Sequence, residues 1–374
     1  MKSINFAVIG CGLMGREFGS AVLRWRHLSA DIAAPVIIGA CDTDPKAREW
    51  FDVFPIKYSV SDYKELLDKP DIEAVYCAVP HHLHEKIYID VINAGKHLMA
   101  EKPFGIDKPA NERILAALNK NPSVFVRCSS EFPFFPACRI LIDWLKNEKF
   151  GRILEIRAAF NHSGDLDLTK PINWKRQAEK NGEYGCIGDL GIHTQHIPLR
   201  MGFIPKNAYA VLTNAALERP DGKGGTAECD TWDNAVTVCE TSGPRGEIFP
   251  MFLETRRMKP GATNQWSIEV YGMDASAKFT TDDPNAFHYT QSWGKEQAWS
   301  RLGVGYKPQI PTVTGPIFEF GFTDAILQMW AAFMSELEGN EAEFGCVKPE
   351  ETAVSHRLLT AALKSYKEKR AVEI

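Results

Sequence analysis

The chain has 374 residues, of which 44% are hydrophobic, and its net charge is −5, with acidic and basic residues interspersed. This balance leaves no basic stripe for a nucleic-acid partner. No uninterrupted apolar run reaches the roughly 18 residues that a membrane-spanning helix needs. The length predicts two or three domains.

The first predicted element is a buried parallel strand over residues 4–9, which runs directly into G-C-G-L-M-G at residues 10–15. A helical pattern follows, as in a Rossmann dinucleotide-binding unit. The first glycine permits a tight turn, the second lets the main chain approach a pyrophosphate, and the third allows close packing of helix on strand. The predicted cofactor contacts in this loop are Gly10, Gly12, Leu13, Met14 and Gly15.

A second strand is predicted over residues 36–41, and Asp42 follows it. A carboxylate at this point would accept hydrogen bonds from the adenine-ribose hydroxyls and repel a 2′-phosphate, which predicts NAD rather than NADP. The alternative is that Asp42 only caps a turn and that Asp44 binds the ribose.

The next elements continue the alternation of strand and helix. We predict strands over residues 72–79, 97–101 and 124–128, and a helix over residues 84–94 that ends at Gly95. This order predicts an α/β domain with a doubly wound parallel sheet. Because ligands bind beyond the carboxyl ends of such strands, the segments after the strands are candidate cofactor contacts. They comprise Val79, Pro80, His81, His84, Glu101 and Lys102.

After residue 128 the pattern changes to several strands with few helices, which favours a large, open and mostly antiparallel sheet. The strands are predicted over residues 152–160, 208–213, 235–241, 247–254, 267–271 and 277–281, after a helix over residues 136–148. Residues 216–226 and most of residues 282–315 are predicted loops, and helices over residues 323–338 and 350–369 close the chain. We therefore predict a Rossmann domain over residues 1–128 and an α+β domain over residues 129–374, with the C-terminal helix packing back toward the first domain.

Two short motifs carry the predicted chemistry. A-E-K-P-F at residues 100–104 contains Lys102, and G-D-L-G-I-H at residues 188–193 contains Asp189 and His193. A lysine, a carboxylate and an imidazole can together manage the proton while a nicotinamide takes the hydride. The alternatives are a solvated surface lysine, an aspartate that caps a helix and a histidine satisfied within the fold. The histidines lack a recognised ligand spacing, so no metal site is predicted.

In this order, G-C-G-L-M-G, V-P-H-H-L-H, A-E-K-P-F, F-G-R-I and G-D-L-G-I-H resemble the motifs of the glucose–fructose oxidoreductase, inositol dehydrogenase and rhizopine-catabolism (Gfo/Idh/MocA) family. The resemblance implies an N-terminal Rossmann domain, a C-terminal domain whose open sheet serves oligomerisation, bound NAD(P) and sugar-like substrates. It also implies that Lys102, Asp189 and His193 are the catalytic residues. The chain departs from the family pattern at His81, where asparagine is common, and at His196, where an aspartate often follows the histidine.

The sequence thus predicts an NAD-dependent oxidoreductase that acts on a secondary alcohol or ketone of a sugar, inositol or related polyol. Lys102, Trp174, Asp189 and His193 are the predicted substrate contacts. Two alternatives remain: an NAD-assisted glycosidase or dehydratase that uses transient oxidation, and a non-catalytic sugar or nucleotide sensor. We expect a homodimer or homotetramer. Because the first strand begins at once and the nine cysteines form no C-x-x-C pair, we also expect a cytoplasmic protein with reduced thiols.

Overall fold

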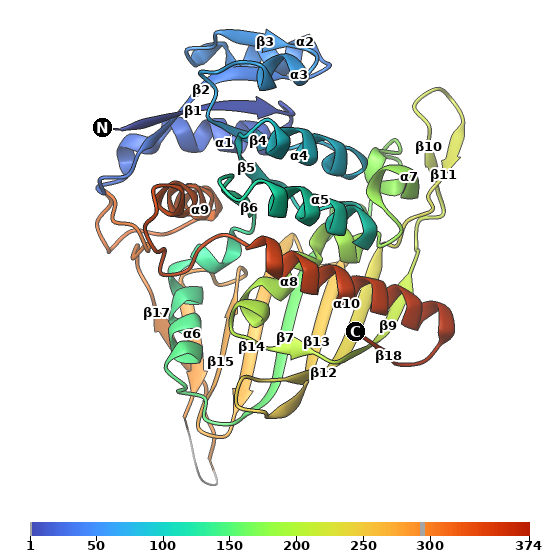
Figure 1. Ribbon diagram of the computed structural model, residues 1–374. Helices are drawn as coiled ribbons and strands as arrows, with labels where there is room; N and C mark the ends of the chain where they lie inside the picture. The colour runs from blue at the N-terminus through green and yellow to red at the C-terminus, as the bar shows by residue number, and fades with distance from the viewer. Residues whose placement is uncertain (1, 292–295) are drawn as a thin grey trace. The chain divides into compact units, whose positions relative to one another are not determined.

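A computed structural model describes residues 2–291 and 296–374. Its internal contacts divide the chain into two compact units (Figure 1). The first unit comprises Met1–Gly105, Pro109–Phe135 and Gly305–Pro349; the second comprises Ile106–Lys108, Pro136–Val304 and Glu350–Ile374. The sequence predicts a domain boundary after residue 128. The division by contacts differs from it mainly in that residues 305–349 join the first unit.

The first unit contains a six-stranded sheet in the order β3-β2-β1-β4-β5-β6, and all its described pairs are parallel. The strands are β1 (Ser3–Ile9), β2 (Ala34–Cys41), β3 (Tyr58–Val60), β4 (Ala74–Cys77), β5 (His97–Ala100) and β6 (Val126–Cys128). This is the strand order of the doubly wound Rossmann fold, so the predicted fold class of this part is confirmed. The order reverses between β1 and β4, which defines where a dinucleotide binds in such sheets.

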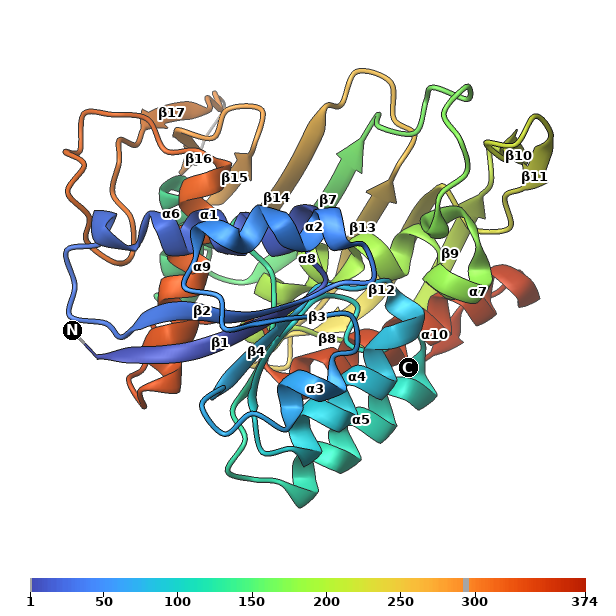
Figure 2. The same ribbon diagram turned by 90° about the horizontal axis from the view of Figure 1, so that it is seen from above.

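The helices of this sheet are α1 (Leu13–Leu23), α2 (Pro45–Glu49), α3 (Lys64–Leu67), α4 (His84–Asn93) and α5 (Lys108–Lys120). The helix predicted to end at Gly95 is confirmed, since α4 stops at Asn93 and Gly95 has a φ of +71°. Such a left-handed residue is the usual end of a helix. Helices α4 and α5 lie side by side (Figures 1 and 2), linked by an ion pair between Glu85 and Arg113.

A late helix completes the core of the first unit. Helix α9 (Phe322–Leu337) places Trp330 against β1 and α1, with its ring 3.9 Å from that of Phe18 and 6.1 Å from that of Phe6. All three side chains are buried. The second C-terminal helix, α10 (Pro349–Glu368), belongs mostly to the second unit. Helix α9 therefore packs with the Rossmann sheet inside the first unit.

The second unit is built on a ten-stranded sheet in the order β17-β16-β15-β14-β7-β13-β12-β9-β18, with β8 paired to β12. Among its described pairs only β7 with β13 is parallel, which confirms the predicted mostly antiparallel sheet. The strands are β7 (Ile153–His162), β8 (Ile204–Pro205), β9 (Asn207–Thr213), β12 (Asn234–Ser242), β13 (Ile248–Arg256), β14 (Asn264–Gly272), β15 (Ser276–Thr280), β16 (Ala286–Thr290), β17 (Ser300–Gly303) and β18 (Val372–Glu373).

One face of this sheet is covered and the other is open. Helix α8 (Cys186–Arg200) packs on β13, β7 and β12, and α6 (Pro136–Lys146) packs on β15 and β16. Alternate residues along β12 and β13 are buried, as a strand with one covered face requires. Trp266 on β14 is buried and points to α8, since its Nε1 donates to the carbonyl oxygen of His193 at 2.9 Å. It is thus not part of the open face, whereas Phe252 and Tyr271 remain partly exposed.

Two segments predicted as loops contain strands. Within and beside residues 216–226, β10 (Glu218–Pro220) pairs with β11 (Thr226–Glu228) as a short hairpin. Residues 282–315 contain β16 and β17, which pair at the edge of the large sheet; residues 292–295 lie outside the described part. These predictions were wrong because β10, β11 and β17 are short and mostly polar, and β16 is only five residues long without a regular buried alternation.

Candidate functional site

The glycine loop of the first unit has the shape that a dinucleotide requires. Gly10 has a φ of +94°, and a Cβ there would lie 2.3 Å from the carbonyl oxygen of Ala78. A Cβ on Gly15 would lie 2.2 Å from the carbonyl oxygen of Gly10. By contrast, nothing lies within 4 Å of a Cβ placed on Gly12, which precedes α1. The loop therefore presents open main chain at a helix N-terminus, which fits a pyrophosphate.

Two further predicted cofactor contacts in this loop are at least partly exposed. The side chain of Leu13 is 75% exposed and that of Met14 is partly exposed. Leu13 is the first residue of α1, so its exposed apolar side chain lies beside the N-terminus of that helix. Such a side chain can contact the apolar faces of a nucleotide while the free main-chain N–H groups bind its phosphates.

Asp42 stands directly after β2, at the edge of the same loop. Its Oδ2 accepts from the main-chain N–H of Cys11 at 2.8 Å, and its Oδ1 accepts from that of Asp44 at 2.9 Å. Asp44 instead caps α2 by accepting from the N–H of Lys46 at 3.0 Å. A carboxylate has about four acceptor positions, so these contacts leave Asp42 able to accept from ribose hydroxyls. Asp42 is thus hydrogen-bonded to the main chain of the glycine loop, whereas Asp44 caps α2.

The segment after β4 contains four of the predicted cofactor contacts. Val79 and Pro80 are partly exposed and His81 is buried. His84 is fully buried, with Nδ1 at 2.7 Å from the carbonyl oxygen of Pro103 and Nε2 at 2.8 Å from that of Val79. Burial lowers the pKa of His84 to about 4. His84 therefore stands between two main-chain segments, those of Val79 and Pro103.

The segment after β5 anchors Lys102 through its neighbour. Glu101 is buried, and its Oε1 accepts from the hydroxyls of Tyr76 at 2.7 Å and Ser129 at 2.8 Å. Its Oε2 accepts from the main-chain N–H of Lys102 at 3.3 Å. The Lys102–Pro103 peptide bond is cis, and the Lys102 side chain is partly exposed. Glu101 thus serves to fix the main chain that carries Lys102.

Glu131 is a titratable residue that the sequence analysis missed. It is only 7% exposed, and burial is the largest effect that raises its pKa, to about 7. The negative charge of Glu101 raises this pKa as well, whereas the positive charge of Lys102 lowers it. A signal was present in the sequence, since this glutamate stands beside the aromatic run F-P-F-F at residues 132–135. Such a run indicates an apolar segment, whereas glutamate itself is seldom fully buried unless it has a partner.

Helix α8 of the second unit carries the other two predicted catalytic residues. Gly185 precedes it with a φ of 57°, and a Cβ there would lie 2.6 Å from the main-chain nitrogen of Trp232. Asp189 and His193 lie one turn apart, as their spacing predicts, and are 1% and 3% exposed. The imidazole of His193 meets the ring of Phe160 edge-on at 5.3 Å. This contact restricts the orientation of the His193 imidazole.

The Asp189 carboxylate is held by two cations from other segments. Arg257 donates to Oδ2 from Nε at 3.3 Å and from Nη2 at 3.1 Å. Lys175 Nζ lies 3.2 Å from Oδ1 and 3.1 Å from Oδ2. Arg257 is fully buried, whereas the Lys175 side chain is 39% exposed. Neither cation was identified from the sequence. With two positive charges at this distance, Asp189 is stabilised as an anion.

Trp174 and two further histidines complete the surroundings of α8. Trp174 is partly exposed, and Lys175 Nζ lies 5.6 Å from the centre of its ring. Burial lowers the pKa of His162, while the charges of Asp165 and Asp189 raise it. Burial also holds the pKa of His196 well below its usual range, and Arg200 Nη2 lies 3.3 Å from its Nε2. His196 is therefore a neutral interior residue near neutral pH, and His162 is a residue that the sequence analysis missed.

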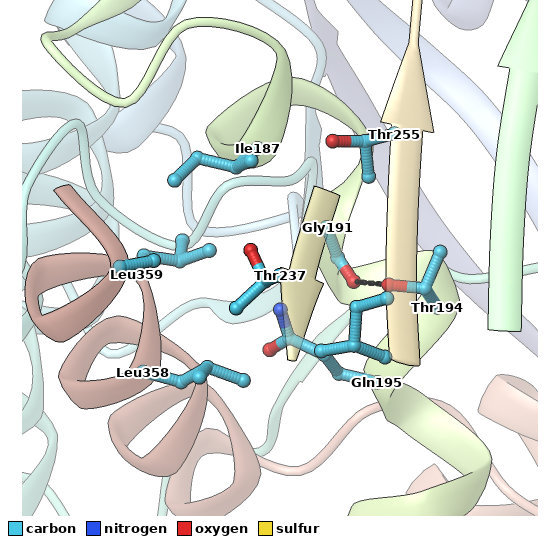
Figure 3. Close-up of a pocket in the computed structure, with 10 residues that line it drawn as sticks. Ile187, Gly191, Thr194, Gln195, Thr237, Thr255, Leu358 and Leu359 are labelled. Atoms are coloured by element: carbon cyan, nitrogen blue, oxygen red, sulfur yellow. Dashed lines mark hydrogen bonds between the residues drawn. The ribbon is translucent and has the colours of Figure 1, made fainter. Parts of the chain in front are cut away.

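A cavity of about 10 Å³ lies between α8, the sheet and α10 within the second unit (Figure 3). The side-chain amide of Gln195 points into it beside Thr237, and the Gln195 Oε1 has no hydrogen-bond partner among the described residues. Thr194 Oγ1 donates to the carbonyl oxygen of Gly191 at 2.8 Å. A cavity of this volume holds about one water molecule. It is therefore too small for a sugar and does not compete with the Asp189 region as a substrate site.

Among residues 2–291 and 296–374, no group of three or more histidine, cysteine, aspartate and glutamate side chains is arranged to hold a metal ion. No helix of the described chain is both long and apolar enough to span a membrane.

Comparison with known proteins agrees with this geometry. The family model described as "Oxidoreductase family, NAD-binding Rossmann fold" (GFO_IDH_MocA) matches residues 4–127, and the GFO/IDH/MocA C-terminal domain model matches residues 139–278. Together the two models cover more than half of the chain, so the resemblance inferred from the motifs is confirmed.

Three known proteins illustrate the similarity. The levoglucosan dehydrogenase of Pseudarthrobacter phenanthrenivorans is 27% identical over 75% of this chain and 74% of its own. The mouse trans-1,2-dihydrobenzene-1,2-diol dehydrogenase is 25% identical over 73% of this chain and 82% of its own. A solved levoglucosan dehydrogenase in complex with NADH and L-sorbose has a TM-score of 0.88 at 22% identity, covering 100% of this chain and 99% of that one. This last likeness confirms the fold.

Proposed function

Because this chain belongs to the Gfo/Idh/MocA family of NAD-binding oxidoreductases, we propose that it interconverts a secondary hydroxyl group and a ketone on a sugar, inositol or related polyol. The chain is an NAD-dependent oxidoreductase; the proposal concerns its substrate and the residues that act on it. The observation that supports it most is the His193 imidazole, held one turn from an Asp189 carboxylate that two cations keep ionised. Similarity to the levoglucosan and dihydrobenzenediol dehydrogenases favours a small polyhydroxylated substrate.

The residues of the glycine loop and Asp42 are the proposed ligands of NAD, which supplies the hydride acceptor or donor. Gly10, Gly12 and Gly15 shape the loop at the start of α1, and Asp42 offers acceptors for the ribose hydroxyls. Val79, Pro80, His81 and Glu101 stand at or near the carboxyl ends of β4 and β5, the edge at which this fold binds dinucleotides. His84 contacts the main chain at Val79 and Pro103, beside that edge, and is a further candidate contact.

We assign the proton chemistry to three side chains. His193 is the general base that takes the hydroxyl proton during oxidation and returns it during reduction, because the unperturbed pKa of an imidazole lies near neutral pH. Lys102 carries a positive charge that stabilises the developing alkoxide oxygen. Asp189 remains an anion beside Arg257 and Lys175, so it positions groups and does not receive the proton. Trp174 offers an aromatic face that suits the C–H face of a sugar ring.

The test is a substrate screen with purified protein. Levoglucosan, myo-inositol, D-glucose and aryl glycosides are each incubated with NAD, and the appearance of NADH absorbance is recorded beside release of the aglycone. Net formation of NADH with a polyol supports the proposal. Aglycone release without net NADH would replace it by redox-assisted elimination. Binding of NAD and sugar without either product would indicate a sensor.

We also propose that the chain forms a homodimer or homotetramer in the cytoplasm. The open face of the large sheet carries exposed apolar side chains, among them Tyr209 at 45% and Val211 at 50% exposure. Burying such a face between copies is a common basis of symmetric assembly. All nine cysteines are free and buried, which suits a reducing compartment.

A further inference from the structure

The two oxygens of the Asp189 carboxylate have different surroundings. Arg257 reaches Oδ2 from within the protein, at 3.3 and 3.1 Å, and is itself fully buried. Lys175 lies across both oxygens, at 3.2 Å from Oδ1 and 3.1 Å from Oδ2, with 39% of its side chain exposed. The arginine is therefore the fixed partner of the carboxylate, and the lysine is the partner that a ligand can reach.

The main chain at Lys175 is held in place by hydrogen bonds, while its ammonium contacts Asp189. Its carbonyl oxygen accepts from the hydroxyl of Thr231 at 2.9 Å and from Arg257 Nη1 at 3.0 Å. Asn173 caps the short helical turn on one side by accepting from the N–H of Lys175 at 2.9 Å. On the other side, the buried Arg176 forms ion pairs with Asp165 and Asp233. This anchorage limits the positions of Lys175 Nζ, as a preorganised binding group requires.

An ammonium beside a carboxylate is matched to a hydroxyl group. An ammonium can only donate hydrogen bonds and a carboxylate can only accept them, whereas a hydroxyl does both. A substrate hydroxyl can thus accept from Lys175 Nζ and donate to Asp189 at the same time. A substrate with a methylene group in place of this hydroxyl would leave Lys175 and Asp189 without their ligand contacts. Such losses make an enzyme discriminate strongly between a substrate and its deoxy analogue.

We propose that Lys175 is a substrate-contacting, specificity-determining residue that binds, together with Asp189, the hydroxyl next to the carbon that is oxidised, so that the substrate is a vicinal diol. This inference rests on the proposed function, in which His193 acts on the reacting hydroxyl. Asp189 and His193 are four residues apart on α8, about 6 Å along the helix axis. Side chains from adjacent turns can therefore hold adjacent groups of one substrate.

The experiment compares the preference for a diol in the wild type and in three variants. The full-length protein is assayed with NAD on levoglucosan, on myo-inositol and on trans-cyclohexane-1,2-diol, each beside an analogue that lacks one hydroxyl (cyclohexanol for the last). The variants are Lys175→Met, Lys175→Arg and Lys170→Met. Lys170 is the matched control, because it is an exposed lysine of the same segment whose Nζ contacts only the main-chain oxygen of Gly164 among the contacts described here.

We expect the wild type to prefer the best diol over its mono-deoxy analogue by about 10²-fold or more in kcat/KM. Lys175→Met should lower that preference at least about tenfold, mainly by raising KM for the diol, while kcat/KM for the analogue changes less than about threefold. Lys175→Arg keeps a donor and should recover part of the preference. Lys170→Met should match the wild type.

An equal loss on the diol and its analogue in Lys175→Met would overturn the proposal, because it would show that Lys175 acts only through the structure. Thermal unfolding of the variant checks that it is folded. Calorimetric titration of the NADH complex with the same probes separates the proposed Lys175 contact from the proposed oxidation of an alcohol. If no alcohol is oxidised, the proposed function fails, yet a diol preference in binding that Lys175→Met abolishes still supports the contact. The absence of any diol preference in both assays would overturn it.

Discussion

Arg257 and Asp189 form a buried ion pair in which both Nε and Nη2 of the arginine donate to one carboxylate oxygen, at 3.3 and 3.1 Å. The same guanidinium donates to the carbonyl oxygens of Lys175 at 3.0 Å and of Gly185 at 3.4 Å, and to Asn181 Oδ1 at 3.1 Å. One side chain thus connects the segment before α8, the start of α8 and the turn of α8 that carries Asp189. The position of Asp189 depends on a residue that lies 68 positions further along the chain.

Replacing Arg257 with methionine should therefore destabilise the protein. The change leaves Asp189 buried without one of its counter-charges, and breaking a buried pair in this way typically costs about 3–5 kcal/mol. The free energy of unfolding, measured by urea denaturation, gives the result. Arg256→Met is the matched control, because Arg256 pairs with Glu254 at a partly exposed position and should change stability by less than about 1 kcal/mol. Similar losses in the two variants would show that Arg257 has no special structural role.

The cofactor preference can be tested at Asp42. A 2′-phosphate would meet this carboxylate at close range, so NAD should bind more tightly than NADP, and a clash of like charges costs several kcal/mol when it is poorly solvated. Asp42→Ser should narrow the difference by weakening NAD binding and strengthening NADP binding. Fluorescence titration of the two cofactors measures both affinities. Equal affinities in the wild type would contradict the assignment of Asp42.

The elements that could be predicted from the sequence are those with local signals. The glycine loop and its flanking strand and helix form one continuous pattern, so Gly10, Gly12 and Gly15 were identified without tertiary information. Arg257 could not be, because a single arginine after a strand has no local mark and its partner Asp189 is distant in sequence. The same holds for Lys175, which contacts Asp189 only once η5 (Trp174–Arg176) and α8 have packed in the second unit.

Trp266 shows that the buried face of a strand cannot be predicted from that strand alone. Alternation identifies the two faces of β14 but does not say which face the helices cover, so the sequence alone does not tell whether Trp266 or Tyr271 is the buried residue. They fall on opposite faces, since their positions differ by an odd number and a strand has a period of two. Contact with α8 decides which face is the core.

The assembly proposal predicts more than one chain per particle. Val211 on β9 is 50% exposed on the open face of the large sheet, and burying a new charge there should weaken association by several kcal/mol. Val211→Glu should therefore shift the light-scattering mass at micromolar concentration toward the monomer. Val313→Glu, at a valine that is 70% exposed in the first unit, serves as the control. A monomeric wild type would rule out this assembly.

Glu131 should make stability depend on pH. Because burial raises its folded-state pKa from 4.5 to about 7, the folded protein binds a proton here that the unfolded chain has released between these two pH values. Stability must therefore fall as pH rises through this window, by up to about 3 kcal/mol from this group. Glu131→Gln should remove that fall while other groups continue to titrate. Urea unfolding at pH values below and above the window, in wild type and variant, measures the difference; identical pH profiles would contradict a raised pKa.

The catalytic assignment predicts a distinct order of effects among Lys102, Asp189 and His193. Lys102→Ala removes the positive charge aimed at the developing alkoxide and should lower kcat by about a hundredfold or more. His193→Ala removes the general base and should lower kcat by about 10²–10⁴-fold, with partial recovery at high pH, where hydroxide substitutes. Asp189→Asn keeps the shape but not the charge, and it should raise KM as well as lower kcat if the carboxylate binds a substrate hydroxyl.

Affinity for NAD separates these effects from loss of the cofactor site. It should change little in all three variants, because the proposed pyrophosphate and ribose contacts lie in the glycine loop and at Asp42. His82→Ala is an additional control at an exposed histidine of the segment after β4, and we expect it to retain normal turnover. Steady-state kinetics on the best polyol from the screen, with cofactor titrations in parallel, provide the measurements. Near-normal turnover in both Lys102→Ala and His193→Ala would place the proton chemistry elsewhere, because neither the charge nor the base proposed here would then be required.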